Sequence, residues 1–257
     1  MSALTRSRVV VVFLAACFAL PLLLSAEDGG GIAVEHSVPP PAYILVGFVG
    51  GFVRHDNPNQ GPVLFARRTQ PTLPKNSYIH IFENRHRKTA YKTILGLLDG
   101  DHNGVLSDRE KTQAHIILFG HSWGGSAVVL LARELNRAGI PVLLTVQVDS
   151  VAKPWQHDDI IPGNVAAAAN FYQPHGFIHG RSMIRAADDS RTRIIGNYRF
   201  DYHQAPVKCE NTSWFDRTFT PDHMQSDCDP RLWNQVGSIV LEHMGQDTGP
   251  IAALPRP

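Results

Sequence analysis

The chain has 257 residues, of which 43% are hydrophobic and 18% are charged, and its formal net charge is +1. A chain of this size and composition buries a full hydrophobic core, which excludes an intrinsically disordered protein. The nearly balanced charge does not favour electrostatic binding of nucleic acid, so we expect no nucleic-acid partner and favour a small-molecule or lipid-like acyl substrate.

The N-terminal segment has the layout of a secretory signal peptide. Arg6 and Arg8 precede an uncharged apolar run over 9–24, and two small residues then lead into a polar, glycine-rich stretch. The run is shorter than the roughly 20 apolar residues that cross a bilayer comfortably. We therefore predict a signal peptide over 1–26, a secreted or periplasmic protein, and no transmembrane helix in its mature form.

An alternative processing site lies inside the same segment. The sequence LAAC, which ends at Cys17, resembles a bacterial lipoprotein cleavage box, and cleavage there would leave Cys17 lipidated at the mature N-terminus. The residues after Cys17 are still strongly apolar, whereas a lipidated cysteine usually opens onto a polar tether. This pattern favours export without a lipid anchor.

Residues 27–41 are rich in Gly and Pro and predict a linker, so the folded domain is expected over 42–257. Within it, apolar runs of strand length alternate with segments of helical period. The predicted strands are 43–46, 78–82, 116–119, 142–148, 167–172 and 193–200. The predicted helices include 89–98, 127–135 and 232–240. This alternation predicts an α/β fold with a mostly parallel central sheet and helices on both faces.

The motif GHSWGG at 120–125 follows the third predicted strand and opens a helix. A G-x-S-x-G sequence in this context predicts a sharp turn that presents the hydroxyl of Ser122 at the helix N-terminus. Glycine is needed around such a turn because a Cβ does not fit beside the strained central residue. Ser122 is therefore the candidate nucleophile.

On these residues the chain resembles the α/β-hydrolase superfamily, and within it the secreted lipases and esterases, over about 42–244. The segment ILVGFVGG at 44–51 is similar to the loop that carries the oxyanion hole of such lipases, with Val46 where they commonly have His. The resemblance implies that the backbone N–H groups of Phe48 and Trp123 bind the developing oxyanion.

The chain order in this superfamily is nucleophile, acid, histidine. Asp149 ends the strand that follows the nucleophile helix, and no acid ends the next strand, so Asp149 is the predicted acid. Among the 13 histidines, His223 lies in a predicted loop just before the last helix, where the superfamily carries the base. His203, which directly follows a strand, is the alternative base.

Residues 99–110 match the twelve-residue EF-hand calcium loop, with Gly104 at its tight turn. The predicted ligands are the side chains of Asp99, Asp101, Asn103, Ser107 and Glu110 and the carbonyl of Val105. The alternative is a plain turn followed by a capping box made by Ser107 and Glu110. Because the loop leads into the N-terminal end of the nucleophile strand, we expect a structural Ca²⁺ away from the chemistry.

Two cysteines, Cys209 and Cys228, remain after signal removal, and they flank His223. In an exported chain such a pair predicts a disulfide, with two free thiols as the alternative.

Taken together, the residues predict an exported serine hydrolase that cleaves a carboxylic ester or thioester through Ser122, His223 and Asp149, without an organic cofactor. An acyltransferase on the same fold would use the same residues and is the first alternative. A calcium-dependent binding module is the second, and it accounts only for the loop over 99–110.

Overall fold

The structure is a computed structural model, and it describes residues 39–210 and 220–245. The predicted signal peptide, Cys17 and most of the predicted linker lie outside the described residues. Among the helices of the described part, none has the length and apolar character needed to cross a membrane.

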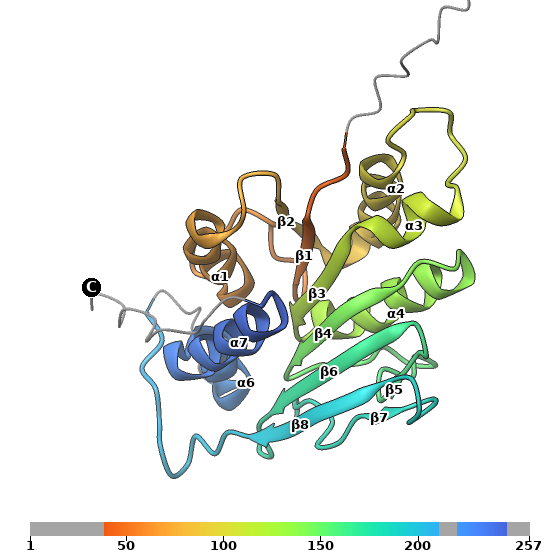
Figure 1. Ribbon diagram of the computed structural model, residues 1–257. Coiled ribbons are helices and arrows are strands. Elements are labelled where there is room, and N and C mark those ends of the chain that lie inside the picture. Colours follow the sequence, from red (N-terminus) through yellow and green to blue (C-terminus); the bar gives the residue numbers. More distant parts are fainter. Residues whose placement is uncertain (1–38, 211–219, 246–257) are drawn as a thin grey trace, which may run out of the picture. The chain divides into compact units, whose positions relative to one another are not determined.

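Six strands form one sheet in the order β2-β1-β3-β4-β6-β8, and each neighbouring pair is parallel (Figure 1). The strands are β1 Tyr43–Val49, β2 Tyr78–Glu83, β3 His115–His121, β4 Val142–Val148, β6 Val165–Tyr172 and β8 Arg193–Arg199. Two short strands, β5 Ile160–Ile161 and β7 Arg185–Ala186, pair separately. All six predicted strands are present, and the predicted fold class is confirmed.

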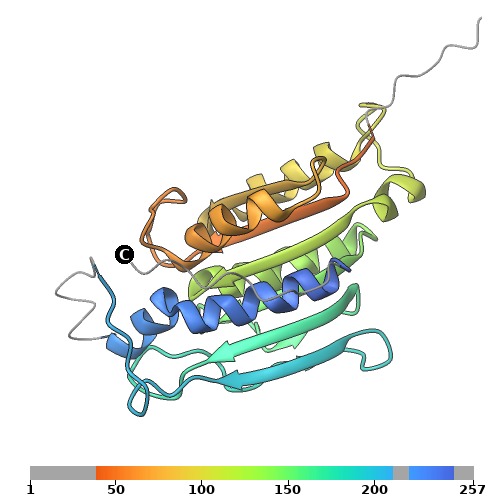
Figure 2. The same ribbon diagram turned by 60° about the vertical axis from the view of Figure 1, so that its left-hand side comes forward.

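Helices cover both faces of the sheet, with α1 and α7 on one face and α2 and α4 on the other (Figures 1 and 2). The helices are α1 Gly61–Thr69, α2 Arg87–Leu98, α3 Asp108–Gln113, α4 Trp123–Arg137, α6 Pro221–Cys228 and α7 Pro230–His243. Short 3₁₀ turns are η1 Gln70–Thr72 and η2 Asn84–His86. The three helices predicted over 89–98, 127–135 and 232–240 are confirmed as parts of α2, α4 and α7.

The core explains why the strands have continuous apolar runs. Along β1, Ile44 and Val46 face the cluster formed with α2 and α4, whereas Leu45 and Val49 face the cluster formed with α1 and α7. Successive strand side chains point to opposite faces, so a strand buried on both sides needs apolar residues at every position. Each fully buried aliphatic side chain contributes about 1.5–3 kcal/mol.

Helices α1 and α6 are absent from the sequence prediction, and the expectation that His223 lies in a loop is wrong, because it stands in α6. Both helices have a proline in their first turn, where the missing N–H costs no hydrogen bond. The buried residues of α6 are polar, namely Asp222, His223, Ser226 and Asp227. A helix without an apolar stripe leaves no periodic signal in the sequence.

Cys209 and Cys228 form a disulfide with a Cα–Cα distance of 5.8 Å, which confirms that prediction. Cys228 is the last residue of α6. The bond therefore ties the helix that carries His223 to the segment that follows β8.

Candidate active site

Ser122 occupies the sharp turn between β3 and α4. Its backbone has φ 58° and ψ −127°, a conformation that residues with a Cβ rarely adopt. The end of β4 and the segment after it hold Ser122 on both sides, because the Ser122 N–H donates to the Val148 carbonyl at 3.0 Å and the Ser122 carbonyl accepts from the Val151 N–H at 3.1 Å. The turn thus presents the hydroxyl at the N-terminus of α4, as the motif predicts.

The structure brings Ser122, His223 and Asp149 together. Nε2 of His223 lies 2.9 Å from Oγ of Ser122, and Nδ1 of His223 lies 2.7 Å from Oδ2 of Asp149. All three residues are buried. A carboxylate beside Nδ1 accepts a hydrogen bond from the Nδ1–H, which leaves the lone pair of Nε2 directed at the serine hydroxyl. The arrangement is able to deprotonate the hydroxyl as it attacks an electrophile.

Asp149 is fully buried and is surrounded by donors. Besides His223, its carboxylate accepts the Gly180 N–H at 2.5 Å, the Gln173 side-chain amide at 3.0 Å and the Gln173 N–H at 3.4 Å. A buried carboxylate needs such donors to offset the loss of hydration. Sequence reasoning missed both residues, although Gln173 directly follows β6, at the sheet edge where Asp149 follows β4.

His203, the alternative base, does not contact Ser122. Its Nε2 lies 3.1 Å from Oδ2 of Asp222, and its ring stacks on His175 with a centroid distance of 3.8 Å. The side chain is 62% exposed. Of the two candidates, His223 is the one placed at the serine.

The oxyanion donors predicted from the resemblance are placed differently from one another. Trp123 is the first residue of α4, directly beside Ser122. Phe48 lies within β1, paired on both sides, and its fully buried ring packs near Phe82. The strand continues to Val49, three residues beyond its predicted end, and this extension keeps Phe48 in the sheet.

The residue of this segment that approaches the serine is Gly50. A Cβ built on Gly50 would lie 3.3 Å from Oγ of Ser122. The turn that follows is closed by a Val53 N–H to Gly50 carbonyl bond, with Gly51 at φ 49°. Asn84, buried at the end of β2, donates its side-chain N–H to the Gly51 carbonyl at 2.6 Å. This turn, rather than Phe48, provides the backbone beside the hydroxyl.

Apolar side chains lie on the outer side of this turn. Phe52 is 82% exposed and meets the ring of Trp123 edge-on at 5.4 Å. The ammonium group of Lys153 lies 4.6 Å from the centre of the Trp123 ring. The approach to Ser122 is therefore bordered by aromatic surface and one cation.

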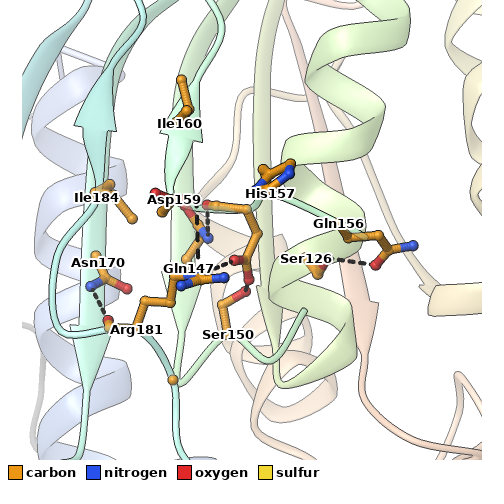
Figure 3. A network of polar contacts seen from close by, with 12 residues as sticks. Ser126, Gln147, Ser150, Gln156, His157, Asp159, Ile160, Asn170, Arg181 and Ile184 are labelled. Carbon is orange, nitrogen blue, oxygen red and sulfur yellow. Dashed lines mark hydrogen bonds and ion pairs between the residues drawn. The ribbon is translucent and has the colours of Figure 1, made fainter. Parts of the chain in front are cut away.

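A polar network behind the acid joins the segments that follow β4 and β6. The carboxylate of Asp158, which is 1% exposed, accepts the Ser150 hydroxyl at 2.6 Å and the Arg181 Nε–H at 3.1 Å (Figure 3). Gln147 donates to the Asp158 carbonyl at 2.9 Å. The same segments line a cavity of about 620 Å³, which also reaches Gln173. The network fixes the loops that hold Asp149.

The predicted calcium loop over 99–110 follows α2 directly, and its last three residues form the start of α3. Carboxylate oxygens of Asp99, Asp101 and Glu110 come within 4.8 Å of one another. The Asn103 side chain instead donates to Asp101 at 2.6 Å and accepts the N–H of the following Val105 at 2.7 Å. The structure thus gathers the three predicted carboxylate ligands, and Ser107 touches one of them, with its hydroxyl 2.7 Å from Oε2 of Glu110.

The alternative feature of that loop, the capping box, is also formed. Ser107 accepts the Glu110 N–H, and the Glu110 carboxylate accepts the Ser107 N–H at 2.9 Å. The Ser107 hydroxyl also donates to that carboxylate at 2.7 Å, and this bond, followed by the one from the Ser107 N–H, lowers the pKa of Glu110. Glu110 is therefore an anion that a cation or a helix cap can equally use.

No protein-family model matches this chain, and no curated protein matches it in sequence. Its fold is similar to that of an acetyl xylan esterase, with a TM-score of 0.38 and 10% identity over 80% of this chain and 97% of the other. It is also similar to a thioesterase from the prodiginine biosynthetic pathway of Streptomyces coelicolor, with a TM-score of 0.44 and 12% identity over 79% of this chain and 89% of the other. A third similar structure is a cutinase-like protein from Cryptococcus sp., with a TM-score of 0.39 and 12% identity over 82% of this chain and 98% of the other. Likenesses this low carry no information about the reaction.

The serine turn packs so closely against β1 that one added methyl group at Gly124 should destabilise the fold. A Cβ on Gly124 would lie 2.3 Å from the Phe48 carbonyl oxygen, so Gly124→Ala must push α4 away from the sheet. We expect the free energy of unfolding to fall by about 1–3 kcal/mol in urea denaturation. The control is Gly96→Ala in α2, where no atom lies within 4 Å and a gain of roughly 0.5–1 kcal/mol is expected. Equal effects of the two changes would contradict this packing.

Proposed function

We propose that the chain is a serine hydrolase that cleaves a carboxylic ester or a thioester. The observation that supports this most directly is the hydrogen-bonded series Ser122–His223–Asp149, whose contacts join residues 101 and 74 positions apart in the sequence. Such long-range convergence of a nucleophile, a base and an acid at a strained turn has no evident structural purpose, whereas catalysis requires it.

In this proposal, Oγ of Ser122 attacks the acyl carbonyl while Nε2 of His223 takes the hydroxyl proton. Asp149 keeps the ring in the required tautomer and stabilises the imidazolium. His223 then gives the proton to the leaving alcohol or thiol, and an acyl-serine remains. A water molecule, deprotonated by the same nitrogen, attacks that acyl group and releases the acid.

The developing negative charge on the carbonyl oxygen needs fixed donors. We propose that the Trp123 N–H, at the N-terminus of α4, provides one of them, and that the turn over 50–53 provides the other. Asn84 supports this turn by binding the Gly51 carbonyl, which orients the peptide groups on either side. The aromatic border made by Phe52 and Trp123 favours a substrate with an apolar part, either a small molecule or a lipid.

A fluorophosphonate probe tests the nucleophile directly. We expect it to label Ser122 in the folded wild type, and we expect Ser122→Ala and His223→Asn each to lower kcat for p-nitrophenyl esters by about 10⁴-fold or more. His203→Asn is the matched control and should lower kcat far less, because that ring contacts Asp222 of α6 instead of the serine.

Failure of the probe to modify Ser122 in folded protein would contradict the proposal. Adding an alcohol acceptor distinguishes a hydrolase from an acyltransferase. An acyltransferase would yield mostly the new ester and little free acid.

We propose in addition that the loop over 99–110 binds a structural Ca²⁺, held by Asp99, Asp101 and Glu110 with the remaining predicted ligands. The support is the spacing of the oxygen ligands and the gathering of three carboxylates within 4.8 Å. An ion there would neutralise their repulsion and fix the connection between α2 and β3.

Calcium should therefore raise the melting temperature. Binding at a concentration 100 times the Kd adds about 2.7 kcal/mol to the free energy of unfolding. We expect Glu110→Gln to abolish this gain in calorimetry, whereas Asp108→Asn, two residues away and outside the ligand set, retains it. A melting temperature that is insensitive to millimolar Ca²⁺ would favour the plain turn and capping box.

We also propose that the protein is exported after removal of residues 1–26. The layout of the N-terminal segment supports this, and so does the disulfide between Cys209 and Cys228, because such bonds persist in oxidising compartments. N-terminal sequencing of the exported protein should begin near Glu27. A lipid on an N-terminal Cys17 would support the lipoprotein alternative, and a retained Met1 would contradict both.

A further inference from the structure

His121 precedes the proposed nucleophile in the chain, and its imidazole faces α6. The side chain is buried, and its Nε2 lies 3.3 Å from the His223 carbonyl oxygen and 3.1 Å from the Ser226 hydroxyl. Its Nδ1 lies 3.3 Å from Oδ1 of Asp227. The ring also stacks on that of His223, with a centroid distance of 4.7 Å. One side chain thus contacts three residues of the helix that carries the proposed base.

Asp227 extends these contacts to two more helices. Its Oδ1 accepts the Gly61 N–H of α1 at 3.0 Å, and its carbonyl oxygen accepts the indole N–H of Trp233 in α7 at 2.7 Å. A Cβ on Gly61 would lie 2.2 Å from the Trp233 indole nitrogen, so only glycine allows this approach. Through His121 and Asp227, α6 is joined to β3, α1 and α7.

The hydrogen atoms in this cluster fix which groups donate. The Ser226 hydroxyl donates its only hydrogen to the His223 carbonyl at 2.7 Å, so Nε2 of His121 must be the donor to that hydroxyl. Burial lowers the pKa of His121 well below its ordinary value, and the neighbouring His223 lowers it further. Burial likewise raises the pKa of Asp227 to about 7, and its protonated carboxyl supplies the hydrogen between Oδ1 and the bare Nδ1 of the neutral His121.

An uncharged His121 suits its position. A positive charge stacked on His223 would oppose the imidazolium that must form there during proton transfer, whereas a neutral ring adds no such repulsion. The histidine is therefore able to hold α6 without impairing the proposed base.

We infer that His121 and Asp227 are positioning residues that fix α6, and through it His223, against Ser122. An eight-residue helix is unstable by itself, and α6 buries polar side chains instead of an apolar stripe, so specific contacts must hold it. Since His121 and Ser122 are consecutive, the same end of β3 places both the helix and the nucleophile. The catalytic part of this inference rests on the proposed function; the part that concerns α6 does not.

The first test compares kcat with stability. His121→Phe keeps an aromatic ring but removes both nitrogens, and it should lower kcat by about 100-fold with little change in KM, the effect of a small misplacement of a reacting group. His121→Gln keeps a side-chain N–H donor and should recover a large part of this loss. The control is Leu98→Ala, which empties a fully buried site in the core formed with α2 and α4. It should lower the melting temperature and leave kcat unchanged.

The second test needs no activity. Amide hydrogen exchange over 221–228 should become at least about tenfold faster in His121→Phe than in the wild type, while α4 keeps its protection. If His121→Phe does not fold, Ser226→Ala replaces it, since it removes the hydroxyl between His121 and the His223 carbonyl, and the same acceleration is expected.

Unchanged exchange in the folded variant overturns the inference, and so does a loss of kcat in Leu98→Ala equal to that in His121→Phe. A wild type that hydrolyses no ester defeats the proposed function instead, and the exchange result then still decides whether His121 holds α6.

Discussion

The 2.9 Å contact between Nε2 of His223 and Oγ of Ser122 constrains the rest of the structure, because it requires two distant elements to be held in place. Its two atoms come from the end of a central strand and from a short helix near the C-terminus. A hydrogen bond tolerates errors of only a few tenths of an ångström, so both elements must be fixed independently of it. The sheet fixes the serine through β4, and a polar cluster together with a disulfide fixes the helix.

Backbone strain and the burial of polar side chains coincide at the candidate active site. Ser122 and Asp149 both have positive φ angles, 58° and 40°, which non-glycine residues adopt at a cost of about 1–3 kcal/mol each. Asp149 also loses its hydration entirely. Its four hydrogen-bond donors come from α6, from the end of β6 and from the segment after it, so the acid is stabilised by parts of the chain far from it in sequence. The apolar core on each face of the sheet is what keeps those parts in position.

The sequence alone predicted those elements that leave a recognisable pattern in neighbouring residues. Apolar runs predicted the strands most clearly where burial is continuous, in β1, β3, β4 and β6. The glycines around Ser122 predicted the turn because a Cβ does not fit there. Asp149 and His223 followed from chain order. The contacts of Gln173, Asn84 and His121 were not predictable, because each partner lies at least 24 residues away and leaves no periodic pattern. Phe48 was misplaced because the length of a strand is set by pairing with its neighbours, which composition does not reveal.

The partnership of Gln173 with Asp149 bears on which substitutions such a site tolerates. The two residues follow adjacent strands, and the amide of Gln173 donates to Oδ2, the same oxygen that faces His223. A single change of Gln173 to Glu would set two carboxylates against each other without the donor that now separates them. The side chains at 149 and 173 are therefore coupled, because a buried carboxylate at one position needs a donor at the other.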